Sequence, residues 1–382
     1  MVHARVKTNK SGALIGSNDD LLTEILLRLP VTSILRFKSV SKHWRLLLSH
    51  THFTHRYDKL SKSPGIFADN VYVPFDVENP STPPPCRNLD TYFDRSGVRI
   101  LQSCNGLLLC CTERGSIGQK AADKYYVFNP TTKQLALIPP IRGGLKVRKT
   151  IRCMGLAFHQ TDCVHYKLVC IRELDTRGEL FQIQIYSSDT RKWKISIESF
   201  PTWIASYSHG VYWNGAVYWA PAYGTFSPLY FKLDVEQLQT LPLPVQMNPS
   251  ETRFGEMYFG ESRGHLHLIV SKRDSLRLNV YEMLSDHSGW FIRYQLELDE
   301  LPGAFPEINI FFDQYELQVI DVVRGEEEED TFLVLVTPFK MITYKAHAKS
   351  FKEIFTLTNS FPFHFHDGYS RFHRYTETLA SF

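Results

Sequence analysis

The sequence lacks the patterns by which secreted and membrane proteins are recognised. Its seven cysteines are scattered and form no C-x-x-C pair, which argues against a disulfide framework and against a zinc ribbon. No apolar run reaches the roughly 18 residues of a membrane span, and no apolar core follows the basic start of the chain, so no signal peptide is indicated. We therefore expect an intracellular protein, cytoplasmic or nuclear, without a membrane partner.

Motifs of catalysis and of phosphate binding are also missing. The chain has no G-x-S-x-G elbow, no phosphate-binding P-loop, no dinucleotide-binding G-x-G-x-x-G and no H-E-x-x-H. His265 and His267 share a face of a predicted strand, but no third metal ligand follows them at a usable spacing. A denser group of possible ligands lies further along the chain: His364, His366, Asp367 and His373. We read all of these as ordinary residues and predict no catalytic residue, no cofactor and no metal site.

The charge is unevenly distributed along the chain. The net charge is +3, yet the first 60 residues carry ten Lys or Arg against four Asp or Glu, and the remainder carries 33 against 36. The basic head has no interleaved aromatic platform of the kind that binds nucleic acids. A solvated polar face explains its cations, so no nucleic-acid partner is expected.

Residues 18–57 carry three short helical patterns around one apolar face. Asp19 and Asp20 stand where negative charge favours the start of a helix, and Pro30 ends that helix. Ser41 is a favourable N-cap for the third pattern, and Phe53 closes the unit. The apolar residues of the three patterns recur at helical spacing: Leu21, Leu22, Ile25, Leu29, Ile34, Leu35, Phe37, Trp44, Leu47 and Leu48.

Such a small helical unit is marginal by itself, because three short helices bury little surface unless a partner covers part of their apolar face. An ordinary helical subdomain would fit the same periodicity. The signature residues, however, resemble those of the plant F-box in their order: Leu29-Pro30, Arg36, Val40-Ser41-Lys42 and Trp44. The resemblance implies docking of a Skp-family adaptor and, through it, of a cullin-RING ubiquitin ligase. We expect the adaptor-binding residues to be Leu21, Leu22, Ile25, Leu29, Pro30, Leu35, Val40 and Trp44, several of which must also serve the core of the unit.

The start of this motif departs from the family pattern. Family members usually place a Leu-Pro or Ile-Pro pair before the two acidic residues, whereas Ser17 and Asn18 stand here. Both are good N-caps, so the helix start is retained, but an apolar contact with the adaptor is lost. We therefore expect weaker adaptor binding than in a family member with the apolar pair.

From residue 98 onward the pattern changes to short strands that repeat. A proline-rich loop, residues 78–88, precedes them. Hairpins with a polar-Gly turn recur at Ser103, Trp213 and Glu261, and Asn-Gly is the favoured chemistry of a tight hairpin. A second phrase, an aromatic-ended strand followed by a polar turn and another strand, recurs with its anchors at Phe128, Tyr186, Phe231, Tyr281 and Tyr344. The gaps between these anchors are 58, 45, 50 and 63 residues.

A period of about 50 residues built from four strands is typical of propeller blades. Five blades are predicted directly, at residues 96–140, 150–200, 203–245, 252–300 and 306–358. A sixth could form if the strands of residues 65–75 pair with the segment after residue 360, which would close the ring and remove its exposed edges. Because the spacing is irregular, a β-sandwich stays open as the alternative.

The β region also resembles a known family. The phrases SCNGLLLC, VFNPTTKQLALIPP, GVYWNGAVYWA and SRFHRYTETLASF are similar to those of the kelch-like, F-box-associated interaction domain that follows the F-box in a large plant family. Two departures, the ERGSIGQKAADK insertion and the acidic run Glu326 to Asp330, are best placed in loops. The acidic run is expected to be solvated, although it could attract a basic partner.

An aromatic-rich stretch, residues 203–226, could form a recognition surface, because aromatic side chains dominate interface hot spots. Alternation along the strands places most of these side chains in the blade core. The three expected exceptions, which we predict to bind a target protein, are Trp203, Tyr223 and Phe226.

The sequence thus predicts an α+β protein: a flexible N-terminus (residues 1–17), a small three-helix F-box (18–60) and a large all-β kelch-like propeller of about six blades (61–382). The predicted function is that of a non-catalytic, substrate-recognition subunit of an SCF-type ubiquitin ligase. The alternatives are a propeller that binds a small molecule or glycan beside a degenerate F-box, a hydrolase of unrecognised type, and an F-box protein that uses the adaptor for assembly alone.

Overall fold

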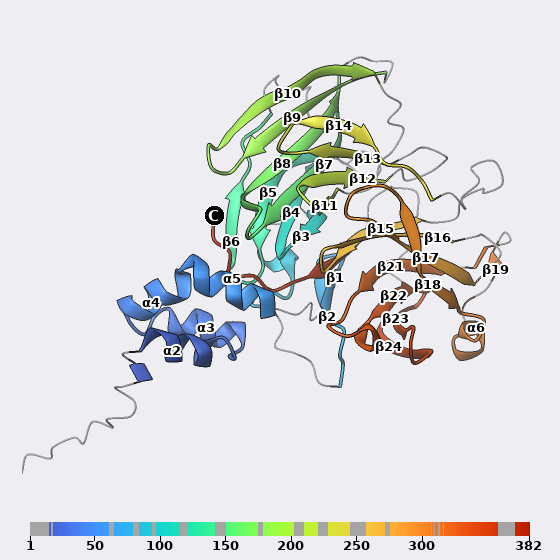
Figure 1. Ribbon diagram of the computed structural model, residues 1–382, viewed down its shortest axis with the longest axis horizontal. Helices are drawn as coiled ribbons and strands as arrows, with labels where there is room; N and C mark the ends of the chain where they lie inside the picture. The colour runs from blue at the N-terminus through green and yellow to red at the C-terminus, as the bar shows by residue number, and fades with distance from the viewer. Residues whose placement is uncertain are drawn as a thin grey trace, which may run out of the picture.

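A helical module at the start of the chain adjoins a ring of β-sheets in the computed structural model (Figure 1). The structure describes residues 15–16, 18–60, 65–78, 84–93, 97–114, 121–141, 150–174, 179–201, 210–220, 228–244, 257–271, 276–306, 308, 310–311, 314–315, 317–357 and 371–382.

The helical module contains α2 (Asp19–Leu26), α3 (Val31–Phe37), α4 (Lys42–Ser49) and α5 (Thr51–Leu60). The Asn18 side chain caps α2 by accepting hydrogen bonds from the amides of Asp20 and Leu21, each at 3.1 Å. The Ser41 hydroxyl caps α4 by accepting one from the Trp44 amide at 3.1 Å. The predicted caps are therefore present, whereas α5, which carries Phe53, was not predicted as a separate helix.

Within the described residues the strands form five four-stranded sheets, one three-stranded sheet and one two-stranded sheet. The first blade comprises β3 (Val98–Cys104), β4 (Leu107–Arg114), β5 (Ala121–Asn129) and β6 (Gln134–Leu137). The second comprises β7 (Ile151–His159), β8 (Cys163–Glu173), β9 (Leu180–Ser187) and β10 (Lys192–Pro201). The third comprises β11 (Val211–Trp213), β12 (Ala216–Trp219), β13 (Leu229–Lys232) and β14 (Gln237–Thr240). The fourth comprises β15 (Met257–Ser262), β16 (His265–Ser271), β17 (Arg277–Met283) and β18 (Trp290–Glu297). The fifth comprises β21 (Gln318–Val323), β22 (Phe332–Val336), β23 (Lys340–Lys345) and β24 (Ser350–Thr356).

Short elements lie between and beside the blades: η1 (Leu89–Thr91), α6 (Leu301–Ala304), β19 (Ile310–Phe311), β20 (Gln314–Tyr315) and η3 (Glu328–Asp330).

The sixth sheet, which we call the closing blade, joins two distant parts of the chain. It contains β1 (Gly65–Ala68), β2 (Val71–Pro74) and β25 (Phe372–Tyr375), in the order β2-β1-β25. β1 pairs antiparallel with β25, with Gly65 opposite Tyr375. The innermost strands then follow one another as β25, β3, β7, β11, β15 and β21. The predicted six-bladed propeller is confirmed, and the β-sandwich alternative is wrong.

One end of the propeller carries the tight hairpin turns, and we call it the turn face. In the inner hairpins of the first and third blades both turn residues have positive φ, at Asn105-Gly106 (46° and 88°) and Asn214-Gly215 (46° and 75°). This is the type I′ geometry for which Asn-Gly is suited, so the predicted hairpins are confirmed. Neighbouring turns touch, since the Asn105 side chain donates to the Phe158 carbonyl at 2.7 Å at the end of β7.

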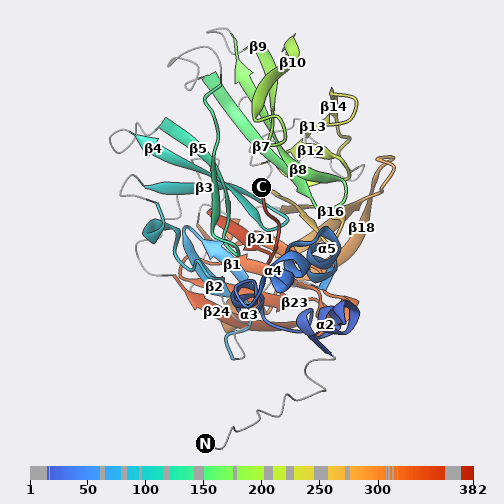
Figure 2. The ribbon, with the colours of Figure 1, turned by 90° about the vertical axis from the view of Figure 1, so that its left-hand side faces the viewer.

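The helical module sits on the turn face and is fastened there by residues 376–382, which we call the strap (Figure 2). Leu379 of the strap is buried in the core of the helical module. The side chain of Asn129, at the turn after β5, donates to the carbonyls of Thr378 (3.2 Å) and Ala380 (2.9 Å). The strap therefore holds the helical module, the first blade and the closing blade together. The buried residues of the module's core are Leu22, Leu26, Leu27, Val31, Ile34, Leu48, Phe53, Tyr57 and Leu379.

Candidate functional site

Between the start of α2 and the end of α4, four large apolar side chains lie outside the module's core and face solvent. Leu21 and Ile25 of α2 are 51% and 47% exposed, Val40 before α4 is 59% exposed, and Leu46 of α4 is 73% exposed. Leu21 and Ile25 are four residues apart and therefore share one side of α2. Leu22 of the same helix is buried in the module's core. α2 therefore has one apolar side that packs into this core and a second apolar side that is exposed to solvent.

The structure separates the predicted adaptor-binding residues into three groups. The exposed ones are Leu21, Ile25, Pro30 and Val40. The half-buried ones, which pack against the module's core, are Leu29, Leu35 and Trp44. Leu22 is buried in that core, which it shares with the strap. The ring of Trp44 contacts that of Phe37 edge-on, with centroids 5.4 Å apart.

Leu46 was not predicted from the sequence as an adaptor-binding residue, because the side of α4 that carries it was expected to be polar. Lys42 and Arg45 lie on that side and are exposed. An apolar residue at a solvent-facing position among cations was the available signal. Together with Leu21, Ile25 and Val40, Leu46 forms the exposed apolar set that we call the helical docking residues.

Polar side-chain contacts join α2 to α4 and to α5. Asp19 contacts the His43 ring of α4 at 2.8 Å, and Glu24 contacts Arg56 of α5 at 2.5 Å. The hydrogen bond and charge of Arg56 lower the pKa of Glu24. These contacts orient α2 without covering its exposed apolar side chains.

The joint between helical module and propeller is polar and partly buried. The Asp58 carboxylate accepts hydrogen bonds from the Thr378 hydroxyl at 2.8 Å, the Leu379 amide at 3.1 Å and the Gln160 side chain. Burial raises the pKa of Asp58 to about 7, although these three donors oppose the shift. The Tyr57 hydroxyl donates to Glu377 at 3.2 Å, and burial raises the pKa of Glu377.

The axis of the propeller holds a small polar cavity of about 110 Å³. Ser103, Tyr258 and Glu261 line it together with Asp321 and Arg374, which form an ion pair with each other. Small-molecule sites usually measure several hundred Å³. The axial cavity is therefore too small for the glycan or metabolite that a propeller-based binding function would require.

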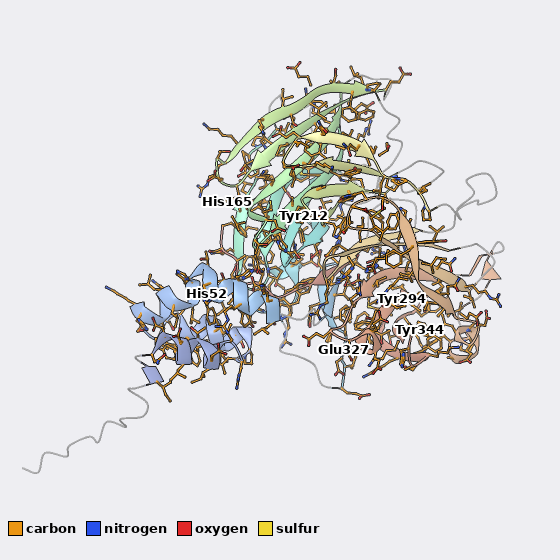
Figure 3. The ribbon with its side chains drawn as sticks, in the orientation of Figure 1. His52, His165, Tyr212, Tyr294, Glu327 and Tyr344 are labelled. Atoms are coloured by element: carbon orange, nitrogen blue, oxygen red, sulfur yellow. The ribbon has the colours of Figure 1, made fainter. Side chains whose placement is uncertain are left out.

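The predicted target-binding residues Trp203, Tyr223 and Phe226 lie outside the described residues, as do Ser17 and the cluster His364, His366 and Asp367. Position 203 falls between β10 and β11, and positions 223 and 226 fall between β12 and β13. β10 and β12 end, and β11 and β13 begin, at the end of the propeller opposite the turn face. The other aromatic residues of this stretch that the structure describes are buried in the blades, as expected: Tyr212, Trp213, Tyr218 and Trp219 (Figure 3 labels Tyr212).

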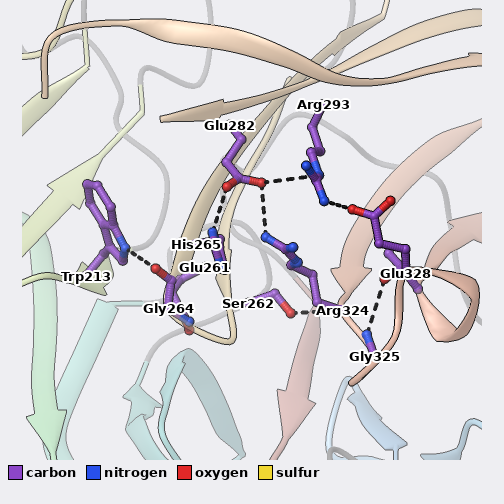
Figure 4. A network of polar contacts seen from close by, with 11 residues as sticks. Trp213, Glu261, Ser262, Gly264, His265, Glu282, Arg293, Arg324, Gly325 and Glu328 are labelled. Carbon is purple, nitrogen blue, oxygen red and sulfur yellow. Dashed lines mark hydrogen bonds and ion pairs between the residues drawn. The ribbon is translucent and has the colours of Figure 1, made fainter. Parts of the chain in front are cut away.

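His265, one of the two histidines on β16, belongs to a polar network between the fourth and fifth blades (Figure 4). The His265 ring lies 2.6 Å from Glu282, which also accepts from Arg324 at 3.0 Å. His267 is fully buried, and burial lowers its pKa to about 3. Among the described residues, no group of three or more His, Cys, Asp or Glu side chains could hold a metal ion.

The acidic run at the β21–β22 connection is partly neutralised by cations of the fourth blade. Glu328 pairs with Arg293, and Glu326 lies 3.8 Å from Arg263. These contacts give the run a role within the chain, at the edge of the same polar network (Figure 4). Within the described part of the chain, no helix has the length and apolar character needed to cross a membrane.

Comparisons with known proteins match both regions. Residues 18–56 match the family model of the F-box domain, and residues 42–365 match that of the F-box associated beta propeller domain. The F-box protein At5g07610 of Arabidopsis thaliana is 30% identical over 407 residues, covering 98% of this chain and 94% of that protein. The Arabidopsis F-box protein At5g49610 is 26% identical over 92% of this chain and 94% of its own length. The Arabidopsis F-box/LRR-repeat/kelch-repeat protein At2g27520 is 29% identical over 85% of this chain and 90% of its own length.

Proposed function

Because this chain belongs to the plant F-box proteins that carry an F-box-associated β-propeller, we propose that it is the substrate-recognition subunit of an SCF-type cullin-RING ubiquitin ligase. Residues 18–60 would dock a Skp-family adaptor, and the propeller, within residues 61–382, would hold a target protein. The chain itself would perform no chemistry. Its contribution would be proximity, since holding a target beside the charged ubiquitin-conjugating enzyme raises the effective concentration of the reacting groups.

The exposed helical docking residues carry this proposal. Taking a fully exposed Leu, Ile or Val side chain to full burial is worth about 1.5–3 kcal/mol, and side chains that are 47–73% exposed would contribute a corresponding share of it. Leu21, Ile25, Val40 and Leu46 are available for such a contact, because the module's own core is completed without them. Pro30 is also exposed, and the half-buried Leu29, Leu35 and Trp44 would supply the edge of the contact.

The test is adaptor binding by the purified chain, measured by titration calorimetry with a Skp-family adaptor. Leu21→Asp combined with Ile25→Asp should lower the affinity by at least about a hundredfold, because two carboxylates would be buried against an apolar partner. Leu135→Asp combined with Leu137→Asp is the matched control, since these leucines are 44% and 58% exposed on β6 of the propeller. Equal binding by both double variants, or no binding by the folded wild-type chain, would refute adaptor docking through this surface.

The unusual start of the motif offers a second test. Asn18 caps α2 with two hydrogen bonds, and replacing a cap of this type costs about 1 kcal/mol. Restoring the family's apolar pair in full would therefore remove a cap while adding a contact. Ser17→Leu alone keeps Asn18, and we expect it to tighten adaptor binding. An unchanged affinity would show that position 17 makes no adaptor contact.

A native complex distinguishes a ligase subunit from an F-box protein that uses its adaptor for assembly alone. The tagged chain should recover both the adaptor and a cullin from plant cells. Recovery of the adaptor without cullin, with the helical docking residues intact, would assign the assembly role instead.

A further inference from the structure

A second cavity, larger than the axial one, opens among the turns of the second, third and fourth blades. Its volume is about 430 Å³, within the range of ligand sites in proteins. Lys167 of β8, Lys232 of β13 and His287 of the β17–β18 turn line it, as does Tyr212 of β11. We call this cavity the turn-face cleft.

Two lysines supply the positive charge of the cleft. Lys167 and Lys232 come from neighbouring blades and are half-buried. Within the described parts of the chain, no carboxylate lies at ion-pair distance from either ammonium group. Lys194, nearby on β10, does have such a partner, because it pairs with Glu236. The charge of Lys167 also acts on Glu236, and the Lys232 ammonium group lies 6.0 Å from the centre of the Tyr230 ring. Because neither lysine forms an ion pair with a described carboxylate, the two ammonium groups that line this cavity would attract an anion placed between them.

The carboxylates at the rim of the cleft are engaged elsewhere. Asp162 lies 3.2 Å from the His159 ring and accepts from the Thr161 hydroxyl at 2.6 Å. Asp234 accepts from the Val235 amide at 2.8 Å within its own turn. Both carboxylates therefore hold the turns that carry them, and neither forms an ion pair with Lys167 or Lys232 among the described residues.

The wall contributed by the fourth blade is aromatic and uncharged. The His287 ring stacks on Tyr230, with centroids 5.3 Å apart and planes within 10°, and its Nε2 lies 2.5 Å from the Tyr218 hydroxyl. Burial and the nearby charge of Lys232 lower the pKa of His287, which favours the uncharged ring. A fixed neutral wall beside two cations resembles a binding site for a side chain that ends in an anion.

We propose that the turn-face cleft receives an acidic side chain of the target protein, held between Lys167 and Lys232. This rests on the proposed function, in which the propeller carries the target. The cleft borders the β7–β8 turn, whose Gln160 contacts Asp58 of α5 and whose Asp162 lines the cleft. A target bound there would lie next to the helical module, on the face where the ligase would assemble. Either a carboxylate or a phosphorylated hydroxyl has the required chemistry.

The experiment is selection from random decapeptide libraries by the purified full-length chain, without adaptor. One position is fixed as Glu, phosphoserine, Gln or Lys in four parallel libraries. We expect enrichment of the Glu or phosphoserine library over the Gln library by at least about tenfold at low salt, falling as salt is raised. Whichever acidic library is stronger identifies the source of the anion.

Variants at the two lysines tie the selection to the cleft. Lys167→Gln combined with Lys232→Gln should abolish the enrichment, whereas Lys192→Gln, at an exposed position of the same blade, should retain it. Lys167→Glu combined with Lys232→Glu should shift the preference to the Lys library, which a merely unfolded variant would not do. Absence of acidic enrichment in the wild type, or its retention in the double Gln variant, would overturn the proposal.

Adaptor binding, measured separately, distinguishes this proposal from the proposed function. If the acidic enrichment fails while the adaptor binds, the cleft assignment is wrong and the ligase role stands. If the enrichment holds while the adaptor does not bind, the cleft is confirmed in a chain that recognises its ligand outside a ligase.

Discussion

Arg374 of β25 is joined to Asp321 of β21 through two nitrogens, with Nε 2.7 Å from Oδ2 and Nη2 contacting Oδ1. Arg374 also donates to the Ser262 hydroxyl at 2.9 Å and to the Val322 carbonyl at 2.7 Å. Asp321 is buried, and Arg374 is nearly so. The pair connects the closing blade to the fifth blade, so a buried ion pair fastens the ring at the point where the two distant parts of the chain meet.

Removing one partner of this pair should be costly. Arg374→Met leaves Asp321 buried without its counter-ion, and we expect a loss of about 3–5 kcal/mol in the free energy of unfolding. Arg371→Met is the matched control, since Arg371 pairs with Asp69 through the same two nitrogens. This second pair is more exposed: the side chain of Arg371 is 40% exposed and that of Asp69 is 36% exposed. That loss should be about 1 kcal/mol or less. Denaturant unfolding measures both, and equal losses would show that the closing ion pair has no special weight.

Two glycines at equivalent turns provide a test of the strap. Gly106 (φ +88°) and Gly215 (φ +75°) both have the positive φ that disfavours alanine, at about 1–2 kcal/mol. A Cβ at Gly106 would lie 2.4 Å from Thr378 Cγ2, whereas one at Gly215 meets nothing within 4 Å. The Gly106→Ala variant should therefore be less stable than the Gly215→Ala variant by about 1–3 kcal/mol, because its added methyl group would be overpacked against Thr378 of the strap. Thermal unfolding with no difference between the two would contradict the placement of the strap.

Leu379 should stabilise the helical module from outside its own segment. Leu379→Ala leaves a cavity in the module's core, so we expect a loss of about 2–5 kcal/mol in stability. Proteolysis of the folded chain should then cut more rapidly between the helical module and β1. Ser381→Ala, at an exposed strap position, is the control and should change stability by less than about 0.5 kcal/mol. Wild-type proteolysis rates in Leu379→Ala would show that the module holds together without the strap.

The joint should be more stable in mildly acidic solution because of Asp58. Its pKa is raised from a usual value of 3.8 to about 7, so the folded chain binds a proton that the unfolded chain releases. This contribution is fully present below about pH 4 and is lost as the pH rises toward 7, at up to about 1.4 kcal/mol per pH unit.

Asp58→Asn should remove that dependence, which is measured as the difference in unfolding free energy between wild type and variant at several pH values. The comparison with the variant is needed because His267, with its pKa lowered to about 3, has the opposite effect as the pH rises toward 6.5. Parallel pH profiles of wild type and variant would mean that Asp58 keeps an ordinary pKa.

The sequence predicted what is encoded locally. The caps of α2 and α4 follow from Asn18 and Ser41, and the type I′ hairpins follow from Asn105-Gly106 and Asn214-Gly215. The blade count followed because each blade repeats the same two hairpins. The pairing of β1 with β25 was also expected, since an open ring would leave its edges unprotected.

Contacts between residues that are far apart in the sequence could not be predicted from these local patterns. Leu379 looks like an ordinary residue of a C-terminal tail, yet it completes a core whose other members precede residue 58. Helical periodicity groups Leu21 with Leu22, but only the packing shows that Leu22 is buried and Leu21 is not. The turn-face cleft is likewise assembled from three blades, so its two lysines are 65 positions apart in the sequence and share no motif.

The strap also sets an order of events during synthesis. The helical module leaves the ribosome first, yet Leu379, which fills its core, and β25, which pairs with β1, follow the five other blades. Domains usually fold in the order in which they emerge, but this module is completed only after the whole propeller has been translated. A chain cut short by premature termination would carry the docking side chains on an unfinished support. Such fragments should compete poorly for a shared adaptor, which would reserve the adaptor for chains with an assembled propeller.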